Sequence, residues 1–174
     1  MNESLQTLLS RRSIRKYKKE QITDQELNQI LEAGMYAPSA KGLQGASMVV
    51  IQDEAVIAAI SAMNAKILGT DSDPLYGAPT VVIVFADPER SANAWSDGCL
   101  VMGNLMNAAA ALGLGSCWIN RAKEEFASPE GKALLKKWGL PEHLVGVGHC
   151  ILGYPAETAP PPKPRKDDYV IFVK

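Results

Sequence analysis

The chain has 174 residues, and its 18 Lys and Arg against 19 Asp and Glu give a formal net charge of −1. Hydrophobic residues make up 47% and charged residues 21%, which is typical of a globular domain and excludes a disordered, collagen-like or coiled-coil chain. We expect one domain over residues 1–174. The near-neutral charge disfavours nucleic acid as a partner, and no apolar run reaches the roughly 18 residues of a membrane span. The polar first residues do not form a signal peptide, so we expect a cytoplasmic protein with no membrane contact.

The three cysteines and two histidines indicate neither a metal site nor a disulfide framework. Cys99, Cys117 and Cys150 are widely spaced, lie in apolar runs and form no C-x-x-C pair, which predicts buried free thiols. His143 and His149 belong to no H-E-x-x-H pattern. We therefore expect no bound metal.

Apolar periodicity predicts helices and strands in an alternating order. The expected helices cover residues 4–10, 23–37, 53–68, 91–112 or 96–112, and 128–139. The expected strands cover residues 48–52, 80–86, 114–119, 144–152 and 169–173. Regular strand–helix–strand units are missing from this order, so the pattern favours the α+β class.

Two of the expected helices carry more specific sequence signals. Thr23 and Glu26 form a capping box, which predicts a helix start, and Pro38 would end that helix. Residues 99–112 carry almost no charge, and a helix that is apolar on every side is expected to be buried on every side.

The C-terminal segment is unusual for a compact monomer. Its four prolines between residues 160 and 164 favour an extended conformation, and the apolar residues 169–173 follow. Such an arm could cross to another subunit and add an edge strand there, or it could dock on its own chain. The sequence alone leaves both arrangements open.

A basic cluster covers residues 11–19, where six of nine residues are Lys or Arg. A solvated connector is one interpretation. Anion capture is the other, because the planar guanidinium suits phosphate and because Ile14 and Tyr17 would anchor the segment to the core. Lys163 and Arg165 form a second cationic pair that could join the same anion.

Two further loops contain small residues. Residues 37–44 read APSAKGLQ, in which Ser39 and Gln44 supply polar groups and the small neighbours allow a ligand to approach closely. Residues 113–120 read GLGSCWIN. This Gly-x-Gly follows a helix rather than a strand and lacks the third glycine of a dinucleotide-binding fingerprint.

Taken together, these motifs resemble the FMN-dependent nitroreductase family. The matching pieces, in order, are RRSIRKY, APSAKGLQ, GLGSCWIN, GYPAE and PKPR. The resemblance implies an α+β sandwich whose central mixed or antiparallel sheet is flanked by helices. It also implies a homodimer with exchanged C-terminal arms and with FMN bound at the interface, in contact with both subunits.

The resemblance assigns the phosphate end of FMN to basic residues. Arg11 and Arg165 match the phosphate-binding arginines of the family, and Lys163 lies beside the second of them. Arg12 and Ser13 match positions along the phosphate and the ribityl chain.

The resemblance assigns the ring end of FMN to a different set. Arg15 matches the cation near flavin N1 and O2, where it would stabilise the charge of the reduced ring. Ile119 and Asn120, with Arg121 following, match the stretch in which a backbone N–H faces flavin N5.

The partner subunit is implied to complete the site through Pro38, Ser39 and Gln44. Two departures from the family lie beside them, because Gly42 stands where the family often has Asn and Gly45 where it often has Pro. The region 64–79 also lacks the polar flavin contacts of some members.

The implied function is an oxidoreductase that takes hydride from NADH or NADPH and passes it to a nitroaromatic, a quinone or a similar small-molecule acceptor by a ping-pong mechanism. No catalytic side chain is expected, because the flavin carries the chemistry. The alternative is a flavin-binding or flavin-sensing protein on the same fold without NAD(P)H turnover. A nucleic-acid-binding module using residues 11–19 and a proline-motif ligand using residues 159–165 explain fewer of the motifs.

Overall fold

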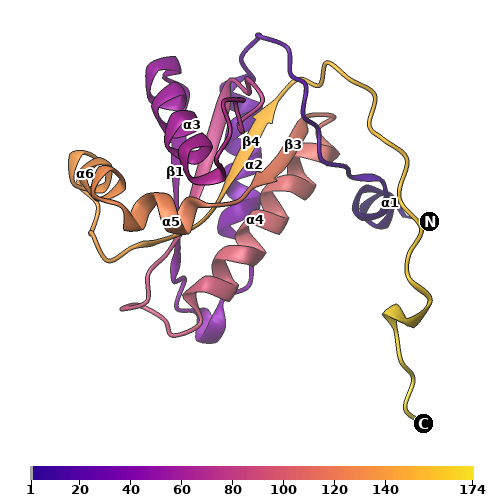
Figure 1. Cartoon of the computed structure of the whole chain (residues 1–174). Coiled ribbons are helices and arrows are strands. Elements are labelled where there is room, and N and C mark those ends of the chain that lie inside the picture. The colour runs from indigo at the N-terminus through magenta and orange to yellow at the C-terminus, as the bar shows by residue number, and fades with distance from the viewer. Residues whose placement is uncertain (1) are drawn as a thin grey trace.

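The computed structural model describes residues 2–174 and shows an α+β fold built on one antiparallel sheet (Figure 1). The strands lie in the order β1-β2-β4-β3. Their bounds are β1 Ala46–Ile51, β2 Thr80–Ala86, β3 Gly115–Ile119 and β4 Val145–Gly153. The four internal strands expected from the sequence are therefore confirmed, with β3 and β1 at the two edges.

Helices cover both faces of the sheet. The α-helices are α1 Glu3–Ser10, α2 Asp24–Met35, α3 Glu54–Leu68, α4 Ala94–Ala111, α5 Ala122–Ala127 and α6 Pro129–Lys137. Single 3₁₀ turns lie at Ala40–Gly42 and Asp167–Tyr169. The core on one face joins the sheet to α2 and α4, and the core on the other face joins it to α3, α5 and α6.

Strand β2 shows why the sheet has two cores. All seven of its residues are buried, and successive side chains point to opposite faces. Val82 and Val84 pack with the core of α2 and α4, whereas Val81, Ile83 and Phe85 pack with the core on the other side. A strand buried on both faces is expected to be a nearly continuous apolar run, and after Thr80 the TVVIVFA pattern is one.

The capping box at the start of α2 is confirmed and is tied to the end of the sheet. The Thr23 side chain accepts from the Glu26 N–H, and Glu26 accepts from the Thr23 backbone. The Tyr154 hydroxyl, just after β4, donates to Glu26 at 2.7 Å. The hydrogen bonds from the Thr23 side chain and from Tyr154 lower the pKa of Glu26.

Helix α4 departs from its expected burial. Val101, Met102 and Leu105 are buried, but Leu100 on the opposite side of the helix remains 47% exposed. The prediction of a helix buried on every side is therefore wrong for a single chain. Helices α1 and α2 also lie against α4, and part of its outer face stays apolar and open.

The end of the chain differs from the prediction. Residues 158–174 are exposed throughout, and Figure 1 shows this yellow segment running away from the sheet. The predicted strand over 169–173 is wrong for one chain, which has a 3₁₀ turn at Asp167–Tyr169 and, within residues 2–174, no backbone paired with this segment. The docking of this arm on its own chain is likewise contradicted.

Helix α5 is an element that the sequence analysis missed, because six residues are too few to show a helical period. Its Phe126 is buried against Phe85 in an edge-to-face arrangement, with ring centroids 4.7 Å apart. The helix also fixes the position of the turn that follows β3.

Within residues 2–174, no cluster of His, Cys, Asp and Glu has the arrangement of a metal site. None of the helices in that part of the chain is long and apolar enough to cross a membrane. Cys117 and Cys150 are buried free thiols as expected, whereas Cys99 on α4 is only half-buried.

The buried thiol of Cys150 gives a testable consequence. Burial raises its pKa from 9.0 to about 12. Its contribution to stability is therefore fully present below pH 9 and is lost as the pH rises towards 12, because the unfolded thiol ionises first. We expect Cys150 to resist iodoacetamide at pH 8 in the native protein and to react in guanidinium, as read by peptide mass spectrometry. Rapid labelling of native Cys150 would contradict this burial.

Candidate functional site

The basic segment is attached to the free edge of the sheet. Strand β3 is an edge strand, and the Ile14 N–H donates to the Ser116 carbonyl oxygen at 3.0 Å. Ser13 pairs with Ser116 in a parallel bridge, and the Ile14 side chain is buried. The segment is thus an anchored extension of the sheet, which excludes the solvated connector.

A second set of contacts holds the same segment, one of them to Tyr154 just after β4 and one within the segment itself. The Lys18 N–H donates to the Tyr154 carbonyl oxygen, and the Tyr17 hydroxyl donates to the Ile14 carbonyl oxygen at 2.6 Å. Burial raises the pKa of Tyr17, so this hydroxyl remains a donor. A Cβ at Gly153 would lie 2.9 Å from the Tyr17 ring, which explains why glycine occupies that position.

Arg11 and Arg12 present buried cationic donors. The Nη1 of Arg12 donates to the carbonyl oxygens of Leu9 and Arg11, at 2.9 and 2.6 Å. The Nη1 of Arg11 and the Nε of Arg12 are buried and make no hydrogen bond within residues 2–174. Buried guanidinium nitrogens without acceptors are costly, so an anion at this position fits the chemistry.

Arg15, Ile119 and Asn120 line one pocket of about 340 Å³, together with Tyr76 and Arg121. The structure therefore brings together the residues that the sequence analysis assigned to the flavin ring. The Arg15 guanidinium lies 5.9 Å from the centroid of the Tyr76 ring, within cation–π range. The Arg15 N–H donates to Glu157 at 2.6 Å, which fixes the backbone and leaves the guanidinium free to face the pocket.

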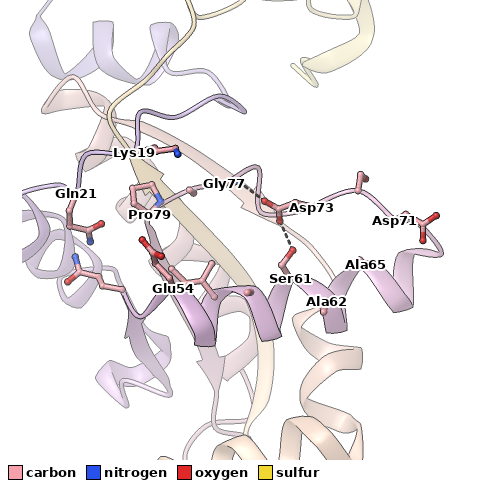
Figure 2. Close-up of a pocket in the computed structure, with 15 residues that line it drawn as sticks. Lys19, Gln21, Glu54, Ser61, Ala62, Ala65, Asp71, Asp73, Gly77 and Pro79 are labelled. Carbon is pink, nitrogen blue, oxygen red and sulfur yellow. Dashed lines mark hydrogen bonds between the residues drawn. The ribbon is translucent and has the colours of Figure 1, made fainter.

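The loop that carries Tyr76 is organised by one carboxylate. Asp73 accepts from the Ser61 hydroxyl at 2.5 Å and from the N–H groups of Leu75 and Gly77 at 2.8 and 2.6 Å. Figure 2 shows Asp73 between α3 and this loop, beside a hollow of about 800 Å³. None of the residues predicted for the site lines that larger hollow.

Pro38, Ser39 and Gln44 line a different pocket, of about 240 Å³, beside α4. The Ser39 hydroxyl accepts from the Gln44 N–H at 3.1 Å, and Asp97 on α4 accepts from the Ala40 N–H at 2.9 Å. Within one chain these residues do not share a pocket with Arg15 and Asn120.

Lys163 and Arg165 lie in the exposed tail. The Arg165 guanidinium donates to the Lys163 carbonyl oxygen, at 3.2 Å from Nε and 2.6 Å from Nη2. Within residues 2–174, no hydrogen bond or ion pair links either side chain to Arg11. The structure of one chain therefore does not bring the two cationic clusters together.

Sequence reasoning missed a buried polar cluster under the pocket, formed by Asn64, Glu125 and His149. His149 was weighed only as a metal ligand, and Asn64 lies in a helix whose pattern is otherwise apolar. The turn above the cluster contains Arg121, whose left-handed φ of 80° is uncommon outside glycine. The available signal was a polar residue within two apolar elements, Asn64 in α3 and His149 in β4, and only the fold brings these residues together with Glu125.

Comparisons with known proteins agree with this geometry. A family model described as the Nitroreductase family matches residues 8–154. The chain therefore belongs to the nitroreductase family.

Individual relatives resemble the chain over most of its length. A protein of Archaeoglobus fulgidus, provisionally named NADH dehydrogenase/NAD(P)H nitroreductase, is 34% identical over 161 residues, which cover 90% of this chain and 88% of that protein. An FMN-bound nitroreductase structure from Bacteroides fragilis gives a TM-score of 0.90 at 31% identity and covers 100% of both chains. An FMN-bound nitroreductase structure from Desulfitobacterium hafniense gives 0.88 at 26% identity, with the same coverage.

The left-handed backbone at Arg121 predicts an order of stabilities. Arg121→Gly and Arg121→Ala remove the same side-chain contacts, but only glycine adopts a φ of 80° without a Cβ penalty. We expect the glycine variant to be more stable than the alanine variant by about 1 kcal/mol in urea unfolding. Equal stabilities, or a more stable alanine variant, would show that this backbone conformation is unstrained.

Proposed function

We propose that this chain is an FMN-dependent NAD(P)H oxidoreductase that works as a homodimer and reduces nitroaromatics, quinones or similar small acceptors. The observation that carries the proposal is the pair of buried guanidinium nitrogens on Arg11 and Arg12, which have no hydrogen-bond partner within residues 2–174. Family membership and the names of FMN-bound relatives support the same assignment.

The residues of this chain would hold FMN by its two ends. Arg11, Arg12 and Ser13 would bind the phosphate and the ribityl chain, with Lys163 and Arg165 adding charge to the phosphate. Arg15 would face the pyrimidine side of the ring, where a cation favours the reduced, anionic form. Bound FMN supplies the two-electron carrier that a ping-pong cycle needs between NAD(P)H and the acceptor.

A second copy of the chain supplies what one copy lacks. Pro38, Ser39 and Gln44 lie in a pocket of their own, which is consistent with contacts to the FMN of a partner subunit. The outer face of α4 and the leucines of α1 leave apolar surface uncovered, including Leu100 at 47% and Leu9 at 63% exposure. Exposed apolar surface of this extent is typical of an interface.

The exposed tail supports an arm that crosses between subunits. Ile171, Phe172 and Val173 are 80%, 80% and 95% exposed in one chain. Burial of three consecutive apolar side chains would be favourable, and the rest of the described chain, residues 2–170, leaves them exposed. We propose that the tail packs on the partner and carries Lys163 and Arg165 to a phosphate site.

The proposed function is tested by a visible spectrum of the purified protein, followed by anaerobic addition of NADH and NADPH in turn. We expect a flavin spectrum that bleaches with at least one of the two donors and recovers when a quinone or a nitroaromatic is added. A flavin spectrum that stays oxidised with both donors would favour the flavin-binding or flavin-sensing alternative. A colourless protein that also refuses added FMN would contradict the cofactor assignment.

Substitution of the phosphate arginines predicts a loss of affinity. Arg11→Ala and Arg165→Ala each remove charge-assisted hydrogen bonds, so we expect FMN binding to weaken about 10- to 100-fold. Fluorescence titration of the apoprotein measures this, and the thermal stabilisation by FMN should shrink in parallel. Lys166→Ala is the matched control, because exposed Lys166 pairs with Asp168 at 3.4 Å. An Arg165→Ala protein with the affinity of the control would remove Arg165 from the site.

Removal of the tail tests the arm. Deletion of residues 160–174 should give a protein that is mostly monomeric by light scattering and that retains little flavin, because both Arg165 and the crossing segment are lost. A stable dimer that keeps its full flavin content after this deletion would contradict the exchange of arms.

A further inference from the structure

A closed polar cluster lies directly beneath the turn at residues 119–121. Asn64 on α3, Glu125 on α5 and His149 on β4 are each 0% exposed. Side chains of these types are rarely buried completely, because they lose their hydration unless the protein replaces it. We assign none of the three to FMN binding, so contact with the cofactor does not explain why these polar side chains are buried.

The members of the cluster contact one another, but Oε2 of Glu125 and Nε2 of His149 form no hydrogen bond of acceptable geometry within residues 2–174. The Asn64 amide donates to one Glu125 oxygen. The other Glu125 oxygen lies 2.8 Å from Nε2 of His149. The carboxylate therefore sits between an amide donor and an imidazole, and the cluster joins three elements of the fold.

The cluster holds two successive carbonyl groups of the turn. The Asn64 amide donates to the Asn120 carbonyl oxygen at 2.8 Å. The Nδ1 of His149 lies 3.4 Å from the Ile119 carbonyl oxygen. Both carbonyls thus point inward, towards buried groups.

The direction of these carbonyls fixes the direction of two amides. In a trans peptide, the C=O of one residue and the N–H of the next point opposite ways, and the described residues contain no cis peptide bond. The N–H groups of Asn120 and Arg121 therefore point away from the cluster, to the side where Asn120 and Arg121 line the pocket with Arg15. Neither N–H donates to another group within residues 2–174.

The side chain of Asn64 also restrains the residue after the turn. Its Oδ1 accepts from Nε of Arg121 at 2.8 Å. This contact and the contact to the Asn120 carbonyl oxygen together hold Arg121 at its left-handed φ of 80°. Asn64 is thus the central residue, because one amide group restrains Asn120, Arg121 and Glu125.

We propose that Asn64, Glu125 and His149 are positioning residues that turn two carbonyls inward and thereby present the N–H groups of Asn120 and Arg121 as a pair of donors to acceptor atoms on the edge of the bound flavin ring. This inference rests on the proposed function for the identity of the ligand. The orientation of the two peptides is a property of this chain alone and can be measured without FMN.

The test compares Asn64→Leu with the wild-type protein. Leucine has a similar volume but removes both the donor to Asn120 and the acceptor for Arg121. In the apoprotein we expect faster hydrogen exchange and shifted NMR resonances for the amides of Asn120 and Arg121. With FMN we expect about tenfold weaker binding and a lower flavin midpoint potential, because donors to the ring stabilise its reduced form.

Two further variants make the test specific. Asp53→Ala removes the N-cap of α3, the helix that carries Asn64, by losing the 2.9 Å bond to the Val56 N–H, and it leaves the cluster intact. We expect this control to lose stability without a change in FMN affinity, in midpoint potential or in the two amides. His149→Phe keeps a planar aromatic ring, although a larger one, and loses the polar contacts to Ile119 and Glu125, so it gives the same test if Asn64→Leu does not fold.

The outcomes separate the two proposals. A wild-type protein that binds no FMN overturns the proposed function and the flavin role of the amides together. If the wild-type protein binds FMN, unchanged amide exchange, affinity and midpoint potential in Asn64→Leu and His149→Phe overturn the positioning role alone. Equal changes in the Asp53→Ala control also overturn it, because they would follow from lost stability.

Discussion

The attachment of residues 13–17 to the outer edge of β3 is the contact on which the site depends. An edge strand has unpaired backbone groups, and here the N–H of Ile14 uses the carbonyl oxygen of Ser116 at 3.0 Å. The buried side chain of Ile14 and the partly buried ring of Tyr17 make the attachment apolar as well as hydrogen-bonded. Without it, the cations of the segment would be mobile surface charges, and surface charges contribute little to specific recognition.

The same edge brings two different kinds of group to one place. Arg15 comes from the attached segment, and Ile119 and Asn120 come from the end of β3, so a cation and a backbone turn meet at one pocket. The elements beneath are rigid, because β4 and α5 pack closely under the turn. A rigid support of this kind is what a site needs when the cofactor supplies the chemistry and the protein supplies position and charge.

Under the proposed function, one chain contributes two separate parts to a site that it does not complete alone. The loop with Ser39 and Gln44 lies by α4, away from the pocket of Arg15, and the tail with Arg165 reaches neither. The apolar residues of α1, α4 and the tail are exposed in one chain, and the proposed dimer would cover them. Dimer formation and cofactor binding would then be coupled, because the same contacts serve both.

Much of this fold follows from local patterns in the sequence. The capping box at Thr23 and the β-branched run of β2 determine their elements with little influence from distant residues. The family motifs also identified the residues that line the pocket, because Arg15 and Asn120 lie within contiguous stretches.

The remaining features depend on tertiary contacts that no local pattern encodes. Helix α5 is too short to show a period, and the cluster of Asn64, Glu125 and His149 joins residues from three separate segments. Two predictions are wrong for one chain: the strand at 169–173 and the burial of residues 99–112 on every side. Each would require a surface that a single copy does not provide.

The shared site is tested most directly by mixing two defective homodimers, one with Arg11→Ala and one with Gln44→Ala, and measuring the flavin content of the heterodimer. If each site takes Arg11 from one chain and Gln44 from the other, the heterodimer contains one site with both substitutions and one intact site. The account predicts that mixing restores tight FMN binding at half of the sites. Failure of the heterodimer to bind FMN more tightly than either parent would contradict a site shared between two copies.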